Sequence, residues 1–407
     1  MKHIKSFFSM VVDGLDEATN GNPRYHVWMG TLTFFILLGA FCYYTQLSEG
    51  LRVTGMHDNV SWGLYISNFT FLVGVAAAAV MLVMPTYILK DMDFKQAVLI
   101  GEGLAVAAII MAILFVVVDV GNPAALWHMM PGVGVFNFPN SILTWDMLVL
   151  NIYLVINITI PMYILYMHYN GKEPNKNVYL PGVFLSVFWA VSLHMVTAFL
   201  YQGLQARPFW NNALLGPRFL ASAFAGGPAL IIIALSMIRK FTEFKIEDKT
   251  IDKIALIVTV AAQVNLIMLI SELFKEFYAH THHSMGAYYL FFGLGEKTAL
   301  VPWIWTSITM NVIATTVLTF HKLRKNYTLL YASCIMLFIA IWIEKGFGLI
   351  VPGFIPGQWG KIVEYTPTLI EVGVTVGIWS LGAFIFTILS KVAIAIELGK
   401  LRYSKTK

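Results

Sequence analysis

The stretch "FPNSILTWDMLVLNIYLVINITIPMYILY", residues 138–166, is apolar enough to cross a membrane, yet it carries Asp146 within its first turns. The hydrocarbon core of a bilayer requires about 20 apolar residues of helix. A charged side chain at mid-bilayer costs about 2.5 to 3.5 kcal/mol on insertion scales, so each one needs an explanation. The stretch therefore predicts a membrane helix and raises the question of what Asp146 does.

The rest of the chain has the same apolar character. Its 407 residues are 58% hydrophobic and 12% charged, with a mean hydropathy of +0.72, whereas ordinary soluble domains have roughly 25% charged residues. The composition indicates an integral membrane protein. Only two cysteines are present, Cys42 and Cys334, and an iron–sulfur cluster needs about four ligands. We therefore expect no cluster held by this chain.

Ten apolar segments are long enough to span a bilayer. They start near Val27, Trp62, Ala97, Met147, Val178, Phe219, Ile254, Thr298, Thr328 and Val372. The first lacks a small-residue cleavage site after it, so we expect it to remain as an anchor. The predicted fold is all-α, a single polytopic domain over residues 1–407, with an N-terminal segment to residue 25, helices over 26–397 and a tail over 398–407.

The loops predict the topology. If the N-terminus is inside, 20 of the 27 lysines and arginines lie in the inner segments and 7 in the outer ones. The positive-inside rule then places both termini in the cytoplasm. We expect the protein in the cytoplasmic membrane. The outer loops are also the longer ones, rich in glycine, proline and aromatic residues, and long loops are more often functional than short ones. We infer that the working face looks outward.

Ionisable residues inside the segments are the candidates for a site. Glu102 and Asp119 share the third helix and lie 17 residues apart, about 25 Å at 1.5 Å per residue. The first is thus expected near the inner face and the second near the outer. Counted in the same way, four groups from separate segments share a depth in the outer third, with His128 in the loop just above them. These four are Asp119, Asp146, His194 and Glu272.

A partly desolvated carboxylate beside an imidazole exchanges protons near neutral pH, which is what a quinone head group requires. Flat side chains against the quinone ring are available in the neighbouring loop, at Trp127, Phe136, Phe138 and Trp145. Each observation has a plainer interpretation: aspartates at helix ends sit at the interface, a lone histidine is hydrogen-bonded in the core, and aromatic residues form interfacial belts.

Two other membrane functions fit the pattern less well than a quinone site. A transporter places charged residues around a midplane cavity, whereas these groups lie off-centre. Haem b needs histidines paired across helices at matching depth, and only His194 is well inside a segment. We therefore expect no haem in this chain.

Several stretches resemble the NrfD/PsrC family of quinone-interacting membrane subunits, and most of all its ten-helix DsrP branch, from the DsrMKJOP complexes of sulfate-reducing and sulfur-oxidising microbes. The "WGLYI" and "ARPFW...PRFLASAF" stretches are the most specific of these. The resemblance is carried by "SWGLYISNFTFLVGVAAAA" from Ser61, "GNPAALWHMM" from Gly121, "PNSILTWDMLVLN" from Pro139, "SLHMVTAFLYQGLQARPFW" from Ser192, "PRFLASAFAGGPAL" from Pro217 and "GKIVEYTPTLIEVGVTVGIW" from Gly360.

The resemblance implies two four-helix bundles, here with two extra helices, that bind menaquinone and dock a ferredoxin-like iron–sulfur subunit on the outer face. It also implies the partners of an anaerobic respiratory complex: a DsrO-like iron–sulfur subunit, a DsrJ-like multihaem cytochrome c, a DsrM-like haem b subunit and a DsrK-like cytoplasmic iron–sulfur subunit. His128 and Asp146 match positions that border the quinone pocket in relatives.

The hypothesis for the site is a quinone pocket in the outer half of helices two to five, in which Asp146 and His128 exchange the quinone protons, helped by Asp119 and His194, between Trp127 and Trp145. A second hypothesis is a proton path between Glu102 and Asp119. The polar residues expected to continue that path are Asn68, Asn151 and Asn157, with Ser67 beside them. A secondary transporter and a purely structural anchor for redox subunits remain as alternatives.

Overall fold

The computed structural model describes residues 2–278, 281–357 and 360–403. Within these residues the fold is helical and contains no strand, which confirms the predicted all-α class. Ten helices are long and apolar enough to cross a membrane, as predicted. They are Pro23–Glu49, Leu64–Tyr87, Ala97–Asp119, Ile142–Tyr169, Lys176–Gln202, Leu215–Phe241, Asp248–Tyr278, Val301–Thr319, Tyr327–Phe354 and Leu369–Glu397.

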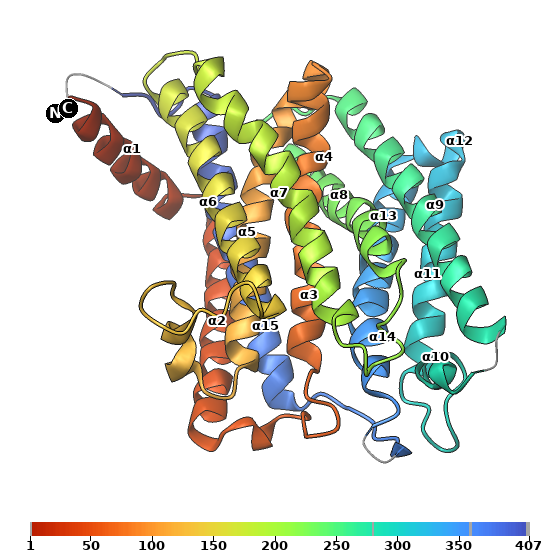
Figure 1. The fold of residues 1–407 in the computed structure, drawn as a ribbon. Helices are drawn as coiled ribbons and strands as arrows, with labels where there is room; N and C mark the ends of the chain where they lie inside the picture. The colour runs from red at the N-terminus through yellow and green to blue at the C-terminus, as the bar shows by residue number, and fades with distance from the viewer. Residues whose placement is uncertain (1, 279–280, 358–359, 404–407) are drawn as a thin grey trace.

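Most spans correspond to one labelled helix in Figure 1. These are α2 (Pro23–Glu49), α5 (Lys95–Asp119), α6 (Ile142–Tyr169), α7 (Lys176–Gln202), α8 (Leu215–Phe241), α9 (Asp248–Tyr278), α11 (Val301–Thr319) and α15 (Leu369–Glu397). Two spans are broken. The second comprises α3 (Leu64–Ala76), η2 (Ala77–Ala79), α4 (Val80–Val83) and the π-helix η3 (Met84–Ile88), and the ninth comprises α13 (Tyr327–Lys345), α14 (Phe347–Ile350) and η7 (Pro352–Phe354).

Local sequence explains where several helices begin. Pro23 occupies the first position of α2, where its missing N–H costs nothing, and the Asn22 side chain accepts a hydrogen bond from the Tyr25 amide. Asn326 caps α13 in the same way. At α15, Thr368 and Glu371 form a capping box, in which each side chain bonds the other's backbone N–H. These caps satisfy amides that the helices themselves leave unpaired.

The contacts between the spanning helices form two rings of four helices each. α3 contacts α5, α5 contacts α6, α6 contacts α7, and α7 contacts α3. In the other half α8 contacts α9, α9 contacts α11, α11 contacts α13, and α13 contacts α8. α2 packs against α15 outside both rings. Two four-helix bundles would need these contacts. The arrangement as two bundles stays a prediction.

The two halves meet along α3 and α8, whose spans have 94% and 67% of their apolar windows buried. Small residues let them approach closely. A Cβ built on Gly227 of α8 would lie 2.4 Å from the Cβ of Ala78 in η2. Glycine and alanine are enriched where membrane helices touch, because backbones pack closely there.

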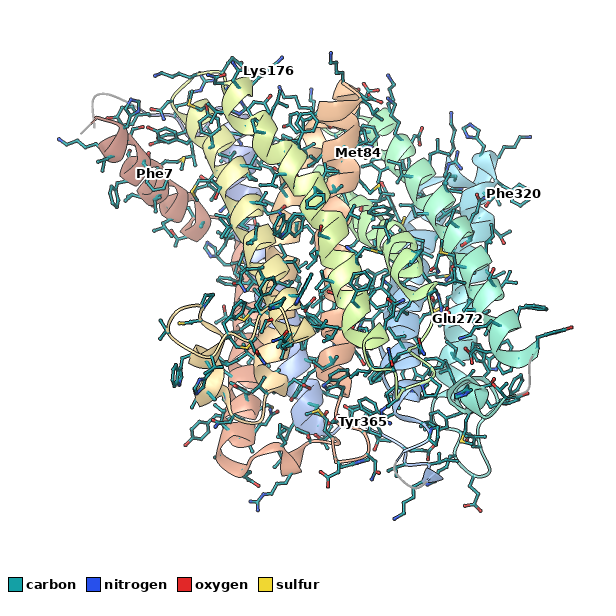
Figure 2. The ribbon with its side chains drawn as sticks, in the orientation of Figure 1. Phe7, Met84, Lys176, Glu272, Phe320 and Tyr365 are labelled. Carbon is teal, nitrogen blue, oxygen red and sulfur yellow. The ribbon has the colours of Figure 1, made fainter. Side chains whose placement is uncertain are left out.

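Shorter elements lie at the two ends of the molecule (Figure 1). The first and last described residues lie at the same end, which we call the terminal face, with α1 (Lys2–Thr19) and α12 (His321–Arg324). The opposite end, the loop face, carries η5 (Pro123–Met129), η6 (His282–Ser284) and α10 (Met285–Phe291). In Figure 2, Lys176 and Met84 lie toward the terminal face, whereas Glu272 and Tyr365 lie toward the loop face.

Candidate functional site

Asp146 lies in the second turn of α6 and is buried, with 2% of its surface exposed. Its Oδ1 accepts a hydrogen bond of 2.6 Å from the hydroxyl of Thr197 on α7. His194 precedes Thr197 by one helical turn, so both lie on the same side of α7. The apolar stretch that raised the question therefore turns its aspartate inward, toward α7 and away from lipid.

His194 is fully buried and has one free nitrogen. Its Nδ1 lies 2.9 Å from the carbonyl oxygen of Ala190, one turn earlier in the same helix. Within the residues that the structure describes, its Nε2 has no hydrogen-bond partner. A buried polar atom without a partner is costly, so this nitrogen is a position where a ligand or water gains a hydrogen bond.

An aromatic cluster continues from α7 toward the loop face. The hydroxyl of Tyr201, one turn after Thr197, hydrogen-bonds Thr70 of α3. The Tyr201 ring centroid lies 5.9 Å from that of Trp62 and 5.5 Å from that of Trp210. Trp210 is fully buried and donates to the carbonyl of Leu349 at 2.8 Å. Sequence reasoning missed these rings as site candidates, although "WGLYI" and "ARPFW" contain Trp62 and Trp210.

The aromatic residues named from the sequence lie apart from this cluster, at the loop face. His128 and Trp127 are exposed on η5 with their rings stacked at 3.8 Å. Trp145 is 39% exposed and donates to the carbonyl of Pro139 at 2.7 Å. The ring centroid of Phe138 lies 5.2 Å from that of Trp145 and 6.2 Å from that of Phe136. Among the described residues, no hydrogen bond or ring contact joins His128 to Asp146.

Asp119 is the last residue of α5, and the lining of a hollow at the loop face begins at the next residue, Val120. The Oδ1 of Asp119 is buried, and no described residue bonds it. The end of α5 is held by Gln46 of α2, whose amide donates to the Val118 carbonyl at 2.6 Å and accepts from the hydroxyl of Tyr65 at 2.6 Å. The hollow has a volume of about 240 Å³. It is lined by the end of α2 and by residues 120–124.

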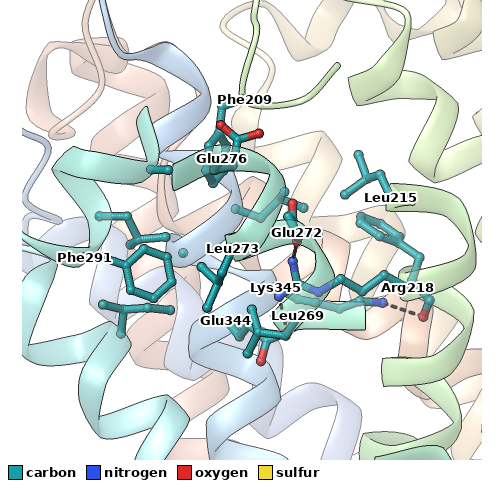
Figure 3. A pocket seen from close by; sticks show the side chains of 16 residues that line it. Phe209, Leu215, Arg218, Leu269, Glu272, Leu273, Glu276, Phe291, Glu344 and Lys345 are labelled. Carbon is teal, nitrogen blue, oxygen red and sulfur yellow. Dashed lines mark hydrogen bonds and ion pairs between the residues drawn. The ribbon is translucent and has the colours of Figure 1, made fainter. Parts of the chain in front are cut away.

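Glu272 belongs to a different set of buried charges, between α8, α9 and α13 (Figure 3). Arg218 pairs with Glu272 and, at 2.6 Å, with Glu344. Lys345 is also buried; its ammonium donates to the Phe219 carbonyl at 2.7 Å and lies 4.1 Å from the centre of the Phe219 ring. These two cations and two carboxylates line a cavity of about 40 Å³ together with Glu276, which pairs with Lys275 at 2.9 Å. The depth counted from the sequence did not reveal that Glu272 pairs with Arg218.

Sequence reasoning missed Arg218, Glu344, Lys345 and Glu371. The pair at 344–345 is followed by "GFGLIV", and the ninth span runs on through it to Phe354. Reading that span to its full length places both charges inside the membrane segment. Glu371 is fully buried at the loop-face end of α15, where it accepts hydrogen bonds from the hydroxyl of Tyr365 at 2.6 Å and the amide of Gly55 at 2.7 Å.

Glu102 and Asn68, both named for a proton path, make contrasting contacts. Glu102 is 5% exposed, and its Oε2 has no partner in the described part of the chain. Asn68 accepts the indole N–H groups of Trp342 at 3.0 Å and Trp379 at 2.8 Å. Asn68 therefore links α3 to α13 and α15, whereas Glu102 has an oxygen left open.

Three further residues named for the path, Asn151, Asn157 and Ser67, bond their own helices. Asn157 is buried and Asn151 is exposed, and each donates a 2.8 Å hydrogen bond to a carbonyl four residues earlier. Ser67 is buried and donates at 2.8 Å to the carbonyl of Gly63. These contacts distribute the polar groups along the helices instead of joining them in one chain.

Metal-ligating side chains are dispersed. In the described ranges, no group of three or more His, Cys, Asp and Glu side chains is placed to hold a metal ion. Cys42 and Cys334 are both free and buried.

A comparison with known protein families matches the part of the chain that holds these buried groups. The family model described as polysulphide reductase, NrfD, matches residues 52–355, which include the whole of the second to ninth spans. The chain belongs to the NrfD family. The match takes in Asp146, His194, Arg218 and Glu344, so the buried groups of both halves lie within the family region of this NrfD protein.

The NrfD protein is similar over nearly its whole length to membrane subunits of redox complexes. It is 23% identical to a putative dimethyl sulfoxide reductase membrane subunit of Halobacterium salinarum, over 88% of each chain. It is 25% identical to an Hdr-like menaquinol oxidoreductase integral membrane subunit of Archaeoglobus fulgidus, over 86% of this chain and 88% of that one. Identity to the menaquinone reductase integral membrane subunit of Nitratidesulfovibrio vulgaris is 23%, over 90% of each chain.

Proposed function

We propose that this NrfD protein is the quinone-interacting membrane subunit of an anaerobic respiratory complex. It exchanges electrons between menaquinone and an iron–sulfur subunit docked on the loop face. Two relatives that match nearly end to end are named for menaquinol oxidation or menaquinone reduction. The observation that carries the proposal is the inward-turned Asp146, which Thr197 holds one turn from His194, whose Nε2 has no partner among the described residues.

The chemistry of a quinone accounts for this arrangement. Reduction of a quinone to a quinol takes up two electrons and two protons, and the reverse reaction releases them. A quinone head group has two carbonyl oxygens, each of which needs a hydrogen-bonding or protonatable partner. His194 and Asp146 supply such partners in the bundle, and the rings of Trp62 and Tyr201 provide flat surfaces beside them.

The loop-face residues have a second part in the proposal. His128 is exposed on η5, and in this proposal it shares with Asp146 the transfer of the quinone protons, helped by Asp119 and His194. Trp127 and Trp145 border the route by which the quinone arrives from lipid, since both are partly exposed. The hollow lined by residues 120–124 begins one residue after Asp119, whose Oδ1 lacks a partner among the described residues.

The orientation and the partners follow from charge and family. The terminal face carries most of the lysines and arginines, so we place it in the cytoplasm and the loop face on the outer side of the cytoplasmic membrane. The proposed partners are those of a sulfate-reduction complex: a DsrO-like iron–sulfur subunit and a DsrJ-like cytochrome c outside, a DsrM-like haem b subunit in the membrane and a DsrK-like iron–sulfur subunit inside.

A proton path from Glu102 to Asp119 is the second part of the proposal. Glu102 supports it, because its carboxylate is buried, one oxygen has no partner in the described part of the chain, and such a group is costly in a membrane. The two carboxylates are about 25 Å apart along α5, so ordered water must connect them. Proteoliposomes holding the complete complex should acidify or alkalinise their lumen during turnover, and a lumen of constant pH would contradict the path.

Purification distinguishes the proposal from a transporter and from an anchor. Extraction in mild detergent, followed by metal, haem and quinone analysis, should recover this chain with cluster-bearing and haem-bearing subunits and with bound menaquinone. A transporter would purify alone and bind a solute. An anchor would retain the partners and contain no quinone. Either result would overturn the proposed function.

A further inference from the structure

Helix α1 packs one side onto the bundle. Every fourth residue on that side is buried: Ser6, Met10, Gly14 and Ala18. Met10 joins Tyr169 of α6 and Ile396 of α15 in a small apolar cluster. The side chain of Ser6 donates to that of Asn170 at 2.7 Å. The small residues at 6, 14 and 18 let the helix lie close to its neighbours.

A second side of α1 is apolar and exposed. It presents two phenylalanines and four aliphatic residues, and their exposed fractions run from 37% to 63%: Ile4, Phe7, Phe8, Val11, Val12 and Leu15. Helical spacing places them on one stripe, while Asp13, Asp16 and Glu17 lie on the opposite side. Figure 1 shows α1 projecting obliquely from the bundle at the terminal face, and Figure 2 labels Phe7 on it.

Contacts at its two ends fix the depth of α1. At its start, His3 Nδ1 lies 3.2 Å from the hydroxyl of Tyr166, near the end of α6. That end is level with the end of α15, because His168 and Glu397 are paired at 2.6 Å. At the other end of α1, Lys391 donates to the Glu17 carbonyl at 2.6 Å. Lys391 lies six residues before the end of α15, so α1 descends by about 9 Å along the bundle.

We propose that α1 is an interfacial membrane helix, whose exposed apolar side is covered by the acyl chains of the leaflet at the terminal face. Helices of this kind bury their apolar side about 5 to 10 Å below the head groups, the depth over which α1 descends. The proposal does not depend on the quinone function.

Continuity with α2 identifies lipid as the occupant. Only residues 20–22 separate the two helices, and Lys391 holds this connection through the carbonyl of Asn20. α2 is the least buried of the spans, with 17% of its apolar window buried, so most of its surface faces lipid. Val27 and Trp28 are exposed in its first turns. The apolar side of α1 therefore adjoins a surface that lies in the bilayer.

Spin labels on α1 test the proposal in the intact complex reconstituted into lipid nanodiscs. Phe8→Cys and Val12→Cys place a nitroxide on the apolar side, and Asp16→Cys places one on the polar side as the matched control. Cys42 and Cys334 are buried, so labelling of the unmodified protein measures the background. Power saturation then compares collision with oxygen, which dissolves in lipid, and with a nickel chelate, which stays in water.

Labels at 8 and 12 should collide severalfold more with oxygen relative to the nickel chelate than the label at 16 does. Two results would overturn the proposal. A nickel-dominated signal at 8 and 12 would place the apolar side in water. Shielding from both reagents would show that a protein subunit, not lipid, covers it. The two positions are read independently, so the failure of one variant to assemble still leaves a decisive measurement.

Discussion

The hydroxyl of Thr197 donates a 2.6 Å hydrogen bond to Oδ1 of Asp146, and this contact joins α7 to α6 inside the bundle. It places a carboxylate from one helix one turn from His194 on the next, beside the aromatic cluster of Trp62, Tyr201 and Trp210. Neither Asp146 nor His194 faces lipid. Their burial, unfavourable by itself, is accounted for if they act on a ligand that enters the bundle.

Replacement of Asp146 by asparagine should lower quinone-linked electron transfer by at least about 100-fold, the usual effect of losing a general acid or base. Asparagine keeps the shape and still accepts from Thr197, so the complex should assemble with its normal subunits. Turnover with a soluble quinol analogue measures the loss. Asp58→Asn is the matched control, because Asp58 is exposed at the loop face; unchanged turnover in Asp146→Asn would reject the assignment.

Replacement of Arg218 by methionine should destabilise the protein by about 3 to 5 kcal/mol, because it leaves Glu272 and Glu344 buried without their cation. Thermal unfolding in detergent measures the change. Arg52→Met is the control, since Arg52 pairs with Glu49 at 3.4 Å on the surface and exposed pairs contribute about 0 to 1 kcal/mol. Adding Glu272→Gln to Arg218→Met should recover part of the loss. Equal stability of Arg218→Met and Arg52→Met would contradict the role given to Arg218 between Glu272 and Glu344.

Leucine at Gly39 should separate α2 from α15. A Cβ built on Gly39 would lie 2.6 Å from the Cα of Gly377, and Gly373 and Gly377 form a GxxxG pair on α15. Overpacking of this kind costs about 1 to 3 kcal/mol. Thermal unfolding and protease access to α2 measure the effect. Gly30→Leu, on the same helix with nothing within 4 Å, should be neutral; similar behaviour of the two variants would refute the close crossing.

Asp93, in the short 3-10 helix η4 (Met92–Phe94) before α5, gives a prediction for pH. Hydrogen bonds from Lys249 and then Lys253 lower the pKa of Asp93 to about 2. Because this lies below the ordinary value near 4, the ionised form stabilises the fold above about pH 4, and that contribution is lost as the pH falls through about 2.

The difference in Tm between the native chain and Asp93→Asn isolates this group from all others. It should be the same at pH 7 and pH 5 and smaller at pH 3. A difference that changes between pH 7 and 5 would show that Asp93 is not held by the two lysines.

The ten spans could be predicted because each apolar run is long enough to leave no alternative. Partners across helices could not be predicted in the same way, since depth along a helix says nothing about which way a side chain points. Counting residues placed Glu272 level with Asp146, but rotation about the helix axis turns Glu272 toward Arg218 and Asp146 toward Thr197. Charges at the break in the ninth span were missed because glycine at 346 and 348 resembles the end of a helix.

Photo-crosslinking with a light-activated menaquinone analogue, followed by peptide mass spectrometry of the intact complex, tests the central claim most directly. The proposal predicts labelled peptides from the start of α6 and the second half of α7, containing Asp146 and His194, and protection by excess menaquinone. Labelling confined to peptides around Arg218, Glu272 and Glu344 would contradict the proposal. So would labelling that excess menaquinone does not reduce.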